Sequence, residues 1–266
     1  MSPPDRQITV PKFVGMKAAG QKITMLTAYD YTMASLLDST GIEGILVGDS
    51  LGTVVQGHPN TLPVTLEEML YHAEMVARAV KHALVVFDMP FLSYQTGIHK
   101  AIENAGRALK QTRCQAVKLE GDAYQVEVTE ALVSAGIPVM AHHGLRPQNV
   151  HQLGGYRVQR NRKQLLADAK SSEKAGAFAI ILECVPADLA IEITASVSIP
   201  TIGIGAGVGC DGQILVTQDL LGMLPGRAPR HAKKYAELER ISVEAVGRYR
   251  DDVRDGSFPT KEQSFD

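Results

Sequence analysis

The feature that most constrains the fold is a two-part unit that recurs along the chain. Each unit is a short apolar run rich in β-branched residues, followed by a stretch with helical spacing. The runs are continuously apolar rather than alternating, which is typical of parallel strands covered on both faces. They are Ile23–Asp30, Gly44–Ser50, Ala83–Pro90, Ala116–Gly121, Pro138–Gly144, Phe178–Val185, Pro200–Gly207 and Gly212–Leu220.

Helix start and stop signals separate the runs. Thr65-Leu-Glu-Glu68 has the spacing of a capping box, and an apolar stripe of helical period follows it. Gly41, Gly136 and Gly176 each follow a helical stretch, where a left-handed C-terminal cap is expected. The last helical stretch has an apolar stripe of its own, formed by Leu238, Ile241, Ala245, Tyr249 and Val253.

Strands that alternate with helices predict a parallel sheet with right-handed crossovers. Eight such units predict a single (β/α)8 TIM barrel domain over residues 1–266, with outer helices and an extra C-terminal helix. An open doubly wound sheet is the alternative. Only about a dozen residues separate the starts of the last two runs, the lower limit for a crossover with its helix, so we expect a truncated helix there.

Composition excludes several classes of protein. The formal net charge is −2, which argues against a broad surface for nucleic acid or anionic membrane. The apolar runs are far shorter than the ~20 residues of a transmembrane helix. The first residues lack the apolar core of a secretory signal, and the 3 cysteines form no CxxC pair. We therefore expect a soluble cytoplasmic protein without a disulfide framework or a structural zinc site.

Polar residues gather where the predicted strands end, which is where TIM barrels carry their active sites. Lys118 and Glu120 are two positions apart, so both side chains point to the same face of a strand. Burying both charges costs several kcal/mol each unless they are paired or bound to a metal. The residues at the strand ends are Asp30, Asp49, Ser50, Asp88, Lys118, Glu120, His142 and Glu183.

Asp49, Asp88 and Glu120 offer the oxygen ligands that Mg²⁺ prefers. The alternative is that each acid caps a helix or pairs with a nearby Lys or Arg. His142 and His143 are adjacent on a strand and point to opposite faces, so at most one reaches the site.

Gly203-Ile-Gly-Ala-Gly207 is similar to part of a dinucleotide-binding fingerprint. The third glycine of that pattern is missing, because Val208 stands in its place. We interpret the segment as a glycine-rich strand end that allows close approach of a ligand or a backbone.

The chain resembles the ketopantoate hydroxymethyltransferase family along most of its length. The similar segments follow the family's order. They are Thr27-Ala-Tyr-Asp-Tyr31, Val47-Gly-Asp-Ser-Leu-Gly52, Gln56-Gly-His58, Thr61-Leu-Pro-Val-Thr65, Asp88-Met-Pro-Phe91, Val117-Lys-Leu-Glu-Gly121, Gly144-Leu-Arg-Pro-Gln148, Gly154-Gly-Tyr156, Leu182-Glu-Cys-Val-Pro186, Ile202-Gly-Ile-Gly-Ala-Gly207 and Asp211-Gly-Gln-Ile-Leu-Val216.

The resemblance implies a (β/α)8 barrel that binds one Mg²⁺ per subunit and assembles as a homo-oligomer, commonly a decamer. The implied reaction moves a hydroxymethyl unit from 5,10-methylenetetrahydrofolate to 3-methyl-2-oxobutanoate and gives 2-dehydropantoate. It passes through a Mg²⁺-stabilised enolate and is the first step of pantothenate biosynthesis. The partners are thus a small 2-oxo acid and a folate, with no nucleic acid and no membrane.

The resemblance also implies a role for each strand-end residue. Asp49 and Asp88 bind the metal directly and lie at the substrate, and Glu120 is the third acid of the metal site. Ser50 and Lys118 bind the oxo acid, and Glu183 is the catalytic base. His142 matches a family histidine near the substrate, whereas His143 departs from the family, which has an aliphatic residue there.

Two other functions stay open on the sequence. A lyase or mutase on a similar barrel also handles a metal enolate, but such enzymes carry a cysteine acid in a loop after a strand. Cys184 lies inside an apolar segment and is interpreted as a small core residue. A barrel without catalytic activity is the other alternative, and it would have lost at least one acid or the lysine.

Overall fold

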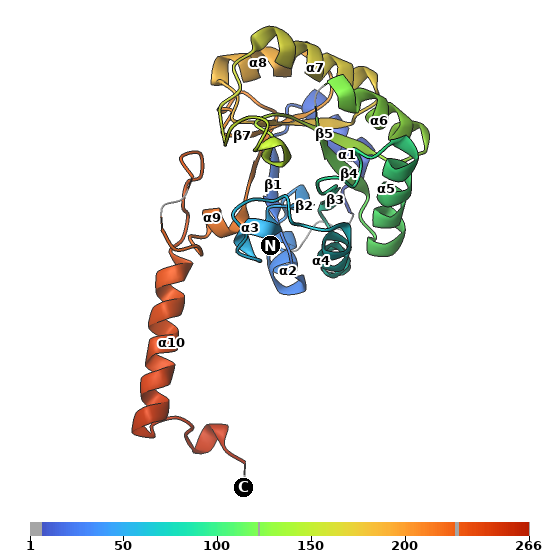
Figure 1. Ribbon diagram of the computed structural model, residues 1–266. Helices are drawn as coiled ribbons and strands as arrows, with labels where there is room; N and C mark the ends of the chain where they lie inside the picture. The colour runs from blue at the N-terminus through green and yellow to red at the C-terminus, as the bar shows by residue number, and fades with distance from the viewer. Residues whose placement is uncertain (1–6, 122, 227–228, 266) are drawn as a thin grey trace. The chain divides into compact units, whose positions relative to one another are not determined.

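The computed structural model describes residues 7–121, 123–226 and 229–265, and its eight parallel strands form a closed barrel (Figure 1). Each strand pairs with the next one in the chain, and β8 pairs with β1. The strands are β1 (Ile23–Thr27), β2 (Gly44–Val47), β3 (Leu84–Asp88), β4 (Ala116–Glu120), β5 (Val139–Gly144), β6 (Ala179–Glu183), β7 (Thr201–Ile204) and β8 (Gly212–Leu215). The predicted TIM barrel is confirmed, and the open sheet is excluded.

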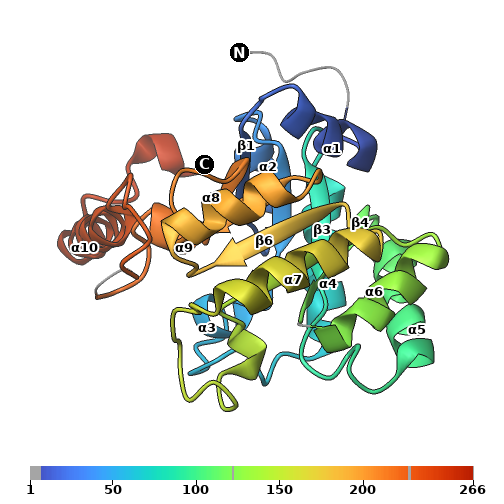
Figure 2. The ribbon, with the colours of Figure 1, turned by 90° about the horizontal axis from the view of Figure 1, so that it is seen from above.

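Helices surround the barrel, as Figure 2 shows. They are α1 (Val10–Ala18), α2 (Tyr31–Asp38), α3 (Leu51–Val54), α4 (Leu66–Ala79), α5 (Ile98–Thr112), α6 (Ala123–Ser134), α7 (Arg162–Lys174) and α8 (Ala187–Ser196), with the 3₁₀ helix η1 (Pro147–Asn149) before α7. Among the described residues, no helix has both the length and the apolar character needed to span a bilayer.

The predicted helix ends are present. Thr65 Oγ1 accepts a hydrogen bond from the Glu68 amide at 3.2 Å, and the Glu68 carboxylate accepts one from the Thr65 amide at 2.7 Å. This capping box satisfies two amides that the first turn of α4 would otherwise leave unpaired. Gly41, Gly136 and Gly176 all have positive φ angles, as expected for left-handed C-terminal caps.

The barrel interior is filled by one apolar cluster. Alternate residues of every strand contribute to it, so the opposite set of side chains points toward the outer helices. Helix α1 adds Phe13 and Met16 to the same cluster, and Phe13 packs edge-on against Phe178 with ring centroids 5.8 Å apart. The strand residues of the cluster are Ile23, Met25, Leu46, Leu84, Val86, Ala116, Met140, Ala179, Ile181, Ile202 and Ile214.

The connection between β7 and β8 differs from the prediction. We expected a truncated helix, but the described residues between these strands form only turns and bends. Gly205 and Gly207 have φ angles of +65° and +78°, which favour a tight return of the chain over a helix. The eighth predicted run was also too long, because β8 ends at Leu215 and Thr217–Leu220 forms the short helix α9.

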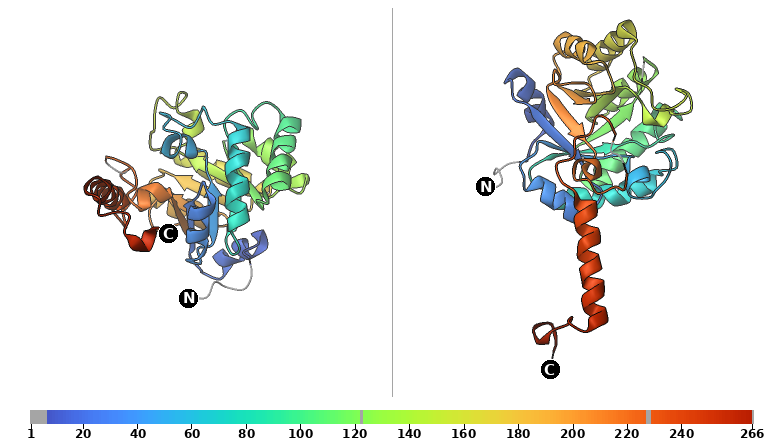
Figure 3. Two further views of the ribbon diagram at one scale, coloured as in Figure 1. Left: turned by 90° about the horizontal axis from the view of Figure 1, so that it is seen from below. Right: turned by 90° about the vertical axis from the view of Figure 1, so that its left-hand side faces the viewer.

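The chain divides into two compact units, Met1–Val216 and Thr217–Asp266. All eight strands lie in the first unit. The second contains α9, α10 (Leu238–Asp255) and the 3₁₀ helix η2 (Lys261–Gln263), of which α10 is the long helix in Figure 3. Helix α10, all of whose residues the structure describes, has no buried residue. That residues 1–266 form a single domain stays a prediction.

Candidate active site

Charged side chains line the barrel interior at the carboxyl ends of β3 to β6. Four of them lie two positions after an apolar residue of the interior cluster, and Glu120 lies two positions after Lys118, so the strand alternation points all five inward. Val86, Ala116, Met140 and Ile181 precede them in this register. The inward-pointing polar residues are Asp88, Lys118, Glu120, His142 and Glu183.

Lys118 binds Asp88 across neighbouring strands. Its Nζ lies 2.7 and 2.8 Å from the two oxygens of Asp88, and 3.6 Å from Oε1 of Glu120. All three side chains are buried. Burial alone would lower the pKa of Lys118, but the carboxylates of Asp88, Glu120 and Asp49 together raise it above its ordinary value. The lysine is therefore a permanent cation inside the barrel.

Asp49 reaches the same group of charges from the segment after β2. Its backbone amide donates to Oδ2 of Asp88 at 3.1 Å. Burial, with a further contribution from the Asp88 charge, raises the pKa of Asp49 to about 7. Ser50 follows at the start of α3, where its hydroxyl bonds to the hydroxyl of Tyr29 at 2.8 Å.

Glu120, His142 and Glu183 continue the line across β4, β5 and β6. His142 Nδ1 lies 3.6 Å from Glu120 Oε1, and His142 Nε2 lies 3.3 Å from Glu183 Oε2. Burial and the Lys118 charge lower the pKa of His142 well below its usual range, so the imidazole is neutral at neutral pH. The Glu183 side chain is 15% exposed, which makes it more accessible than its neighbours in this line.

His143 points away from the site. Its Nδ1 lies 2.9 Å from the carbonyl oxygen of Gly121, and its Nε2 lies 2.8 Å from Oγ of Ser172 on α7. The prediction that at most one of the two adjacent histidines reaches the site is confirmed, and that histidine is His142.

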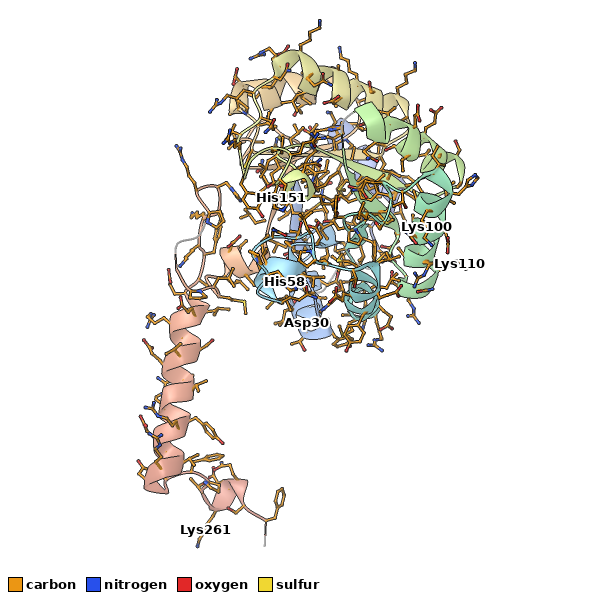
Figure 4. All side chains as sticks on the ribbon, in the orientation of Figure 1. Asp30, His58, Lys100, Lys110, His151 and Lys261 are labelled. Carbon is orange, nitrogen blue, oxygen red and sulfur yellow. The ribbon has the colours of Figure 1, made fainter. Side chains whose placement is uncertain are left out.

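Asp30 is not part of this group. Its Oδ1 accepts a hydrogen bond from the Met33 amide at 2.8 Å, so it caps α2. Figure 4 labels it, and it also labels His58 and His151 on the segments that follow β2 and β5. Asp30 therefore has the alternative role considered for an acid at a strand end, that of a helix cap.

The acids fit a hard divalent cation in their chemistry and charge. Asp49, Asp88 and Glu120 are three buried carboxyl groups that face one buried ammonium group, and a dication would favour the charged forms of Asp49 and Glu120, which burial disfavours. Glu120 Oε1 is buried and has no hydrogen-bond partner among the described residues. Leaving such an atom without a partner costs about 1–3 kcal/mol of stability unless a ligand binds to it.

The same acids do not form a ready-made metal cluster. Within the described parts of the chain, no group of three or more His, Cys, Asp or Glu side chains is arranged to hold a metal ion. Lys118 occupies both oxygens of Asp88. These two oxygens offer about four lone pairs, so Asp88 can keep this ion pair and still bind a cation. The ligand roles of Asp49, Asp88 and Glu120 stay predictions.

Sequence reasoning assigned no role to two buried neutral residues at the site. Tyr94 follows β3, and its hydroxyl contacts the backbone of Glu120. Gln148 lies in η1, and it donates hydrogen bonds to both Asp49 and Glu120. Gln148 belongs to a segment that resembles the family, but the sequence holds no charge signal that would have marked it.

Comparison with known sequences agrees with the family resemblance of the sequence motifs. Residues 7–261 match the sequence model of the family described as ketopantoate hydroxymethyltransferase. A Desulforapulum autotrophicum protein named 3-methyl-2-oxobutanoate hydroxymethyltransferase is 52% identical and covers 97% of this chain and 98% of its own length. A Clostridium novyi protein of the same name is 53% identical, with coverages of 97% and 95%.

Comparison with solved structures shows the fold alone. A 2,3-dimethylmalate lyase superimposes with a TM-score of 0.63 at 18% identity, covering 98% of this chain and 93% of that one. A phosphonopyruvate hydrolase has a TM-score of 0.60 at 14% identity, with coverages of 94% and 88%. These barrels share the architecture, and at such identities their chemistry carries no argument for this chain.

Proposed function

The chain belongs to the ketopantoate hydroxymethyltransferase family, and from this premise we propose the reaction that it catalyses. A hydroxymethyl unit passes from 5,10-methylenetetrahydrofolate to 3-methyl-2-oxobutanoate, giving 2-dehydropantoate and tetrahydrofolate in the first step of pantothenate synthesis. The observation that carries the proposal is the line of contacts Asp88–Lys118–Glu120–His142–Glu183 at the carboxyl end of the barrel, buried except for Glu183. It supplies a cation for the oxo acid and a carboxylate for its C3 proton.

The oxo acid has two groups that need separate recognition. Its carboxylate and keto oxygens require positive charge, and its C3–H bond requires a base. One Mg²⁺ per subunit, held by Asp49, Asp88 and Glu120, would act as a Lewis acid on the oxygens and make the C3 proton more acidic.

Lys118 supplies positive charge from the protein itself. Its raised pKa keeps the ammonium group charged, and its burial excludes the water that would weaken its attraction for the substrate oxygens. Asp88 holds the ammonium group at 2.7 Å, so its position is set before the substrate arrives. The hydroxyl of Ser50 is a further donor for the oxo acid.

Glu183 accepts the C3 proton. Its carboxylate lies on the next strand but one from Lys118 and is partly exposed, so a substrate anchored at Lys118 can reach it. The C3–H bond breaks, and its electron pair forms the new C–C bond to the methylene carbon. Both C–N bonds of that carbon break, water supplies the hydroxyl oxygen, and the two folate nitrogens take up the C3 proton and one proton of the water, which gives tetrahydrofolate. His142 contacts Glu183 as a neutral imidazole and therefore does not add a second positive charge.

We also propose a cytoplasmic homo-oligomer, a decamer in its complete form. Two features support it. Cys114, Cys184 and Cys210 are all free thiols, as expected in a reducing compartment. Helix α10 exposes a row of apolar side chains, among them Val246 at 66% and Tyr249 at 57% exposure, which a subunit contact would bury.

The reaction is tested with 5,10-methylenetetrahydrofolate labelled with ¹³C in the methylene group. Incubation with 3-methyl-2-oxobutanoate and Mg²⁺ is expected to place the label in the hydroxymethyl carbon of 2-dehydropantoate, as read by ¹³C NMR. The same mixture without enzyme is the control. Cleavage of 2-hydroxy or 2-oxo acids with no transfer of label would instead favour a lyase on this barrel.

A further inference from the structure

Gln148 is a buried neutral side chain between the acids of the site. It lies in η1, the short 3₁₀ helix that follows β5, and is 4% exposed. Its side chain reaches the segment after β2, and its backbone faces the end of β4. No role in the proposed reaction has been given to it so far.

Each polar group of Gln148 that faces the site has a partner. Its backbone amide donates to Oε2 of Glu120 at 3.0 Å. Its Nε2 donates to Oδ2 of Asp49 at 3.0 Å and to the carbonyl oxygen of Met89 at 2.9 Å. Its Oε1 accepts from the Tyr94 hydroxyl at 2.7 Å and from Nε2 of Gln95 at 3.3 Å.

These partners fix the orientation of the amide. The carbonyl oxygen of Met89 only accepts hydrogen bonds, so it requires the NH₂ end of Gln148 on its side. On the other side, Oε1 accepts the hydroxyl of Tyr94 at 2.7 Å and Nε2 of Gln95 at 3.3 Å, both of which can donate. The reversed amide would put an oxygen against both Asp49 and Met89.

The fixed amide connects Asp49, which follows β2, with Glu120, which ends β4. Two carboxylates repel each other when both are charged, so neither holds the other in place. Gln148 gives one donor to each of them, the side-chain NH₂ to Asp49 and the backbone amide to Glu120. A single short helix thus sets where both carboxylates lie.

We infer that Gln148 is a positioning residue that holds the carboxylates of Asp49 and Glu120 in place for a divalent cation. The inference rests on the metal-dependent reaction proposed above and adds a determinant of metal affinity to it. Because groups that orient metal ligands contribute strongly to affinity, the loss of this amide is expected to weaken Mg²⁺ binding about 10–100-fold.

The test replaces the amide without changing its length. Gln148→Met removes both side-chain donors and keeps the backbone amide that binds Glu120. Gln115→Met is the matched control, because Gln115 Oε1 accepts one hydrogen bond from the Val85 amide at 2.8 Å, at the opposite end of β4. Mg²⁺ is titrated calorimetrically into the metal-free wild type and both variants, with and without saturating 3-methyl-2-oxobutanoate.

The expected result is a Mg²⁺ dissociation constant raised about 10–100-fold in Gln148→Met and unchanged in Gln115→Met. The Mg²⁺ concentration that half-saturates turnover should rise by the same factor, whereas kcat at saturating Mg²⁺ should return close to the wild-type value. If Gln148 had only a structural role, both variants would have a lower melting temperature. The Mg²⁺ dissociation constant and the Mg²⁺ concentration that half-saturates turnover would then stay unchanged.

Two outcomes separate the inference from the proposed function. If the wild type binds Mg²⁺ and folded Gln148→Met binds it equally well, the inference is wrong and the proposed reaction stands. If the wild type binds no Mg²⁺, either with or without 3-methyl-2-oxobutanoate, the metal part of the proposed function fails and the inference fails with it. Should Gln148→Met not fold, Tyr94→Phe removes the shorter of the two hydrogen bonds that orient Oε1, and an unchanged dissociation constant there would also overturn the inference.

Discussion

Lys118 is 4% exposed, and both oxygens of Asp88 lie within 2.8 Å of its ammonium group. A buried ion pair of this kind costs about as much desolvation energy as its attraction returns, so it adds little to stability. Glu120, at 3.6 Å from the same ammonium group, adds a further charge to the same interior. The retention of these charges is explained by the chemistry proposed for them.

Replacing the proposed base separates proton removal from binding. Glu183→Gln keeps the shape of the side chain and loses its basic oxygen, so kcat should fall about 10²–10⁴-fold. The dissociation constant of 3-methyl-2-oxobutanoate should change little, because Lys118 is expected to hold the oxygens at the other end of the molecule. Steady-state kinetics and calorimetric titration of the oxo acid measure the two quantities. Equal losses of turnover and binding would assign Glu183 to substrate binding.

The buried carboxyl of Asp49 makes stability depend on pH. Its pKa is raised to about 7 in the folded protein, whereas an unfolded aspartate titrates near 4. Between these values the folded state holds a proton that the unfolded chain has lost, so stability falls as the pH rises through this window. Asp49→Asn removes this dependence.

The free energy of unfolding of Asp49→Asn, relative to the wild type, should therefore increase from about pH 5 to about pH 8. The expected increase is about 1–4 kcal/mol, from the size of the pKa shift. Urea unfolding of metal-free protein at both pH values measures it. A difference that stays constant across this range would show that Asp49 titrates normally.

Gly144 links the end of β5 to the end of β6. Its φ angle is +96°, and a Cβ atom placed there would lie 2.2 Å from the carbonyl oxygen of Glu183. That oxygen accepts the Leu145 amide at 2.8 Å, so the two strand ends approach each other directly. The glycine lets β5 turn away from the barrel without displacing the strand that carries the proposed base.

Gly144→Ala should destabilise the protein by about 2–4 kcal/mol, because a side chain there is strained and collides with backbone. Gly106→Ala is the control, because Gly106 lies inside α5 with open space around its Cβ position. That change should stabilise the protein by about 0.5–1 kcal/mol. Denaturant unfolding compares the two. Similar stabilities would mean that the strand ends adjust freely.

The strands were predictable because their apolar runs are continuous and bounded by glycine, proline or polar residues. The last run was read too far, since Leu220 is apolar and lies just beyond Gln218 and Asp219, which belong to α9. The charged residues of the site were predictable from their place at strand ends. Gln148 and Tyr94 were not, because neutral residues in loops acquire their role only when the fold brings them between the acids.

The whole barrel explains why residues rather than architecture decide the function. Its solved structural neighbours include a lyase and a hydrolase at 18% and 14% identity, so the fold supports several chemistries. Three relatives that share 50%, 52% and 53% of its residues are each named 3-methyl-2-oxobutanoate hydroxymethyltransferase. The side chains at the strand ends therefore determine the function.

Assembly is a property of the whole molecule that α10 lets us test. Val246→Glu places a charge in the exposed apolar row of this helix, and it should lower the mass of the oligomer measured by light scattering during size exclusion. Asp251→Lys, on the polar side of the same helix, should leave the mass unchanged. A wild type that elutes as a monomer would contradict the proposed oligomer.

The central claim is that this barrel removes the C3 proton of 3-methyl-2-oxobutanoate with the help of a divalent cation. Proton NMR of the oxo acid in D₂O, with enzyme and without folate, follows that step alone. The C3 proton signal should disappear when Mg²⁺ is present and persist when the metal is removed. A C3 signal that persists with Mg²⁺, even after tetrahydrofolate is added, would contradict the central claim.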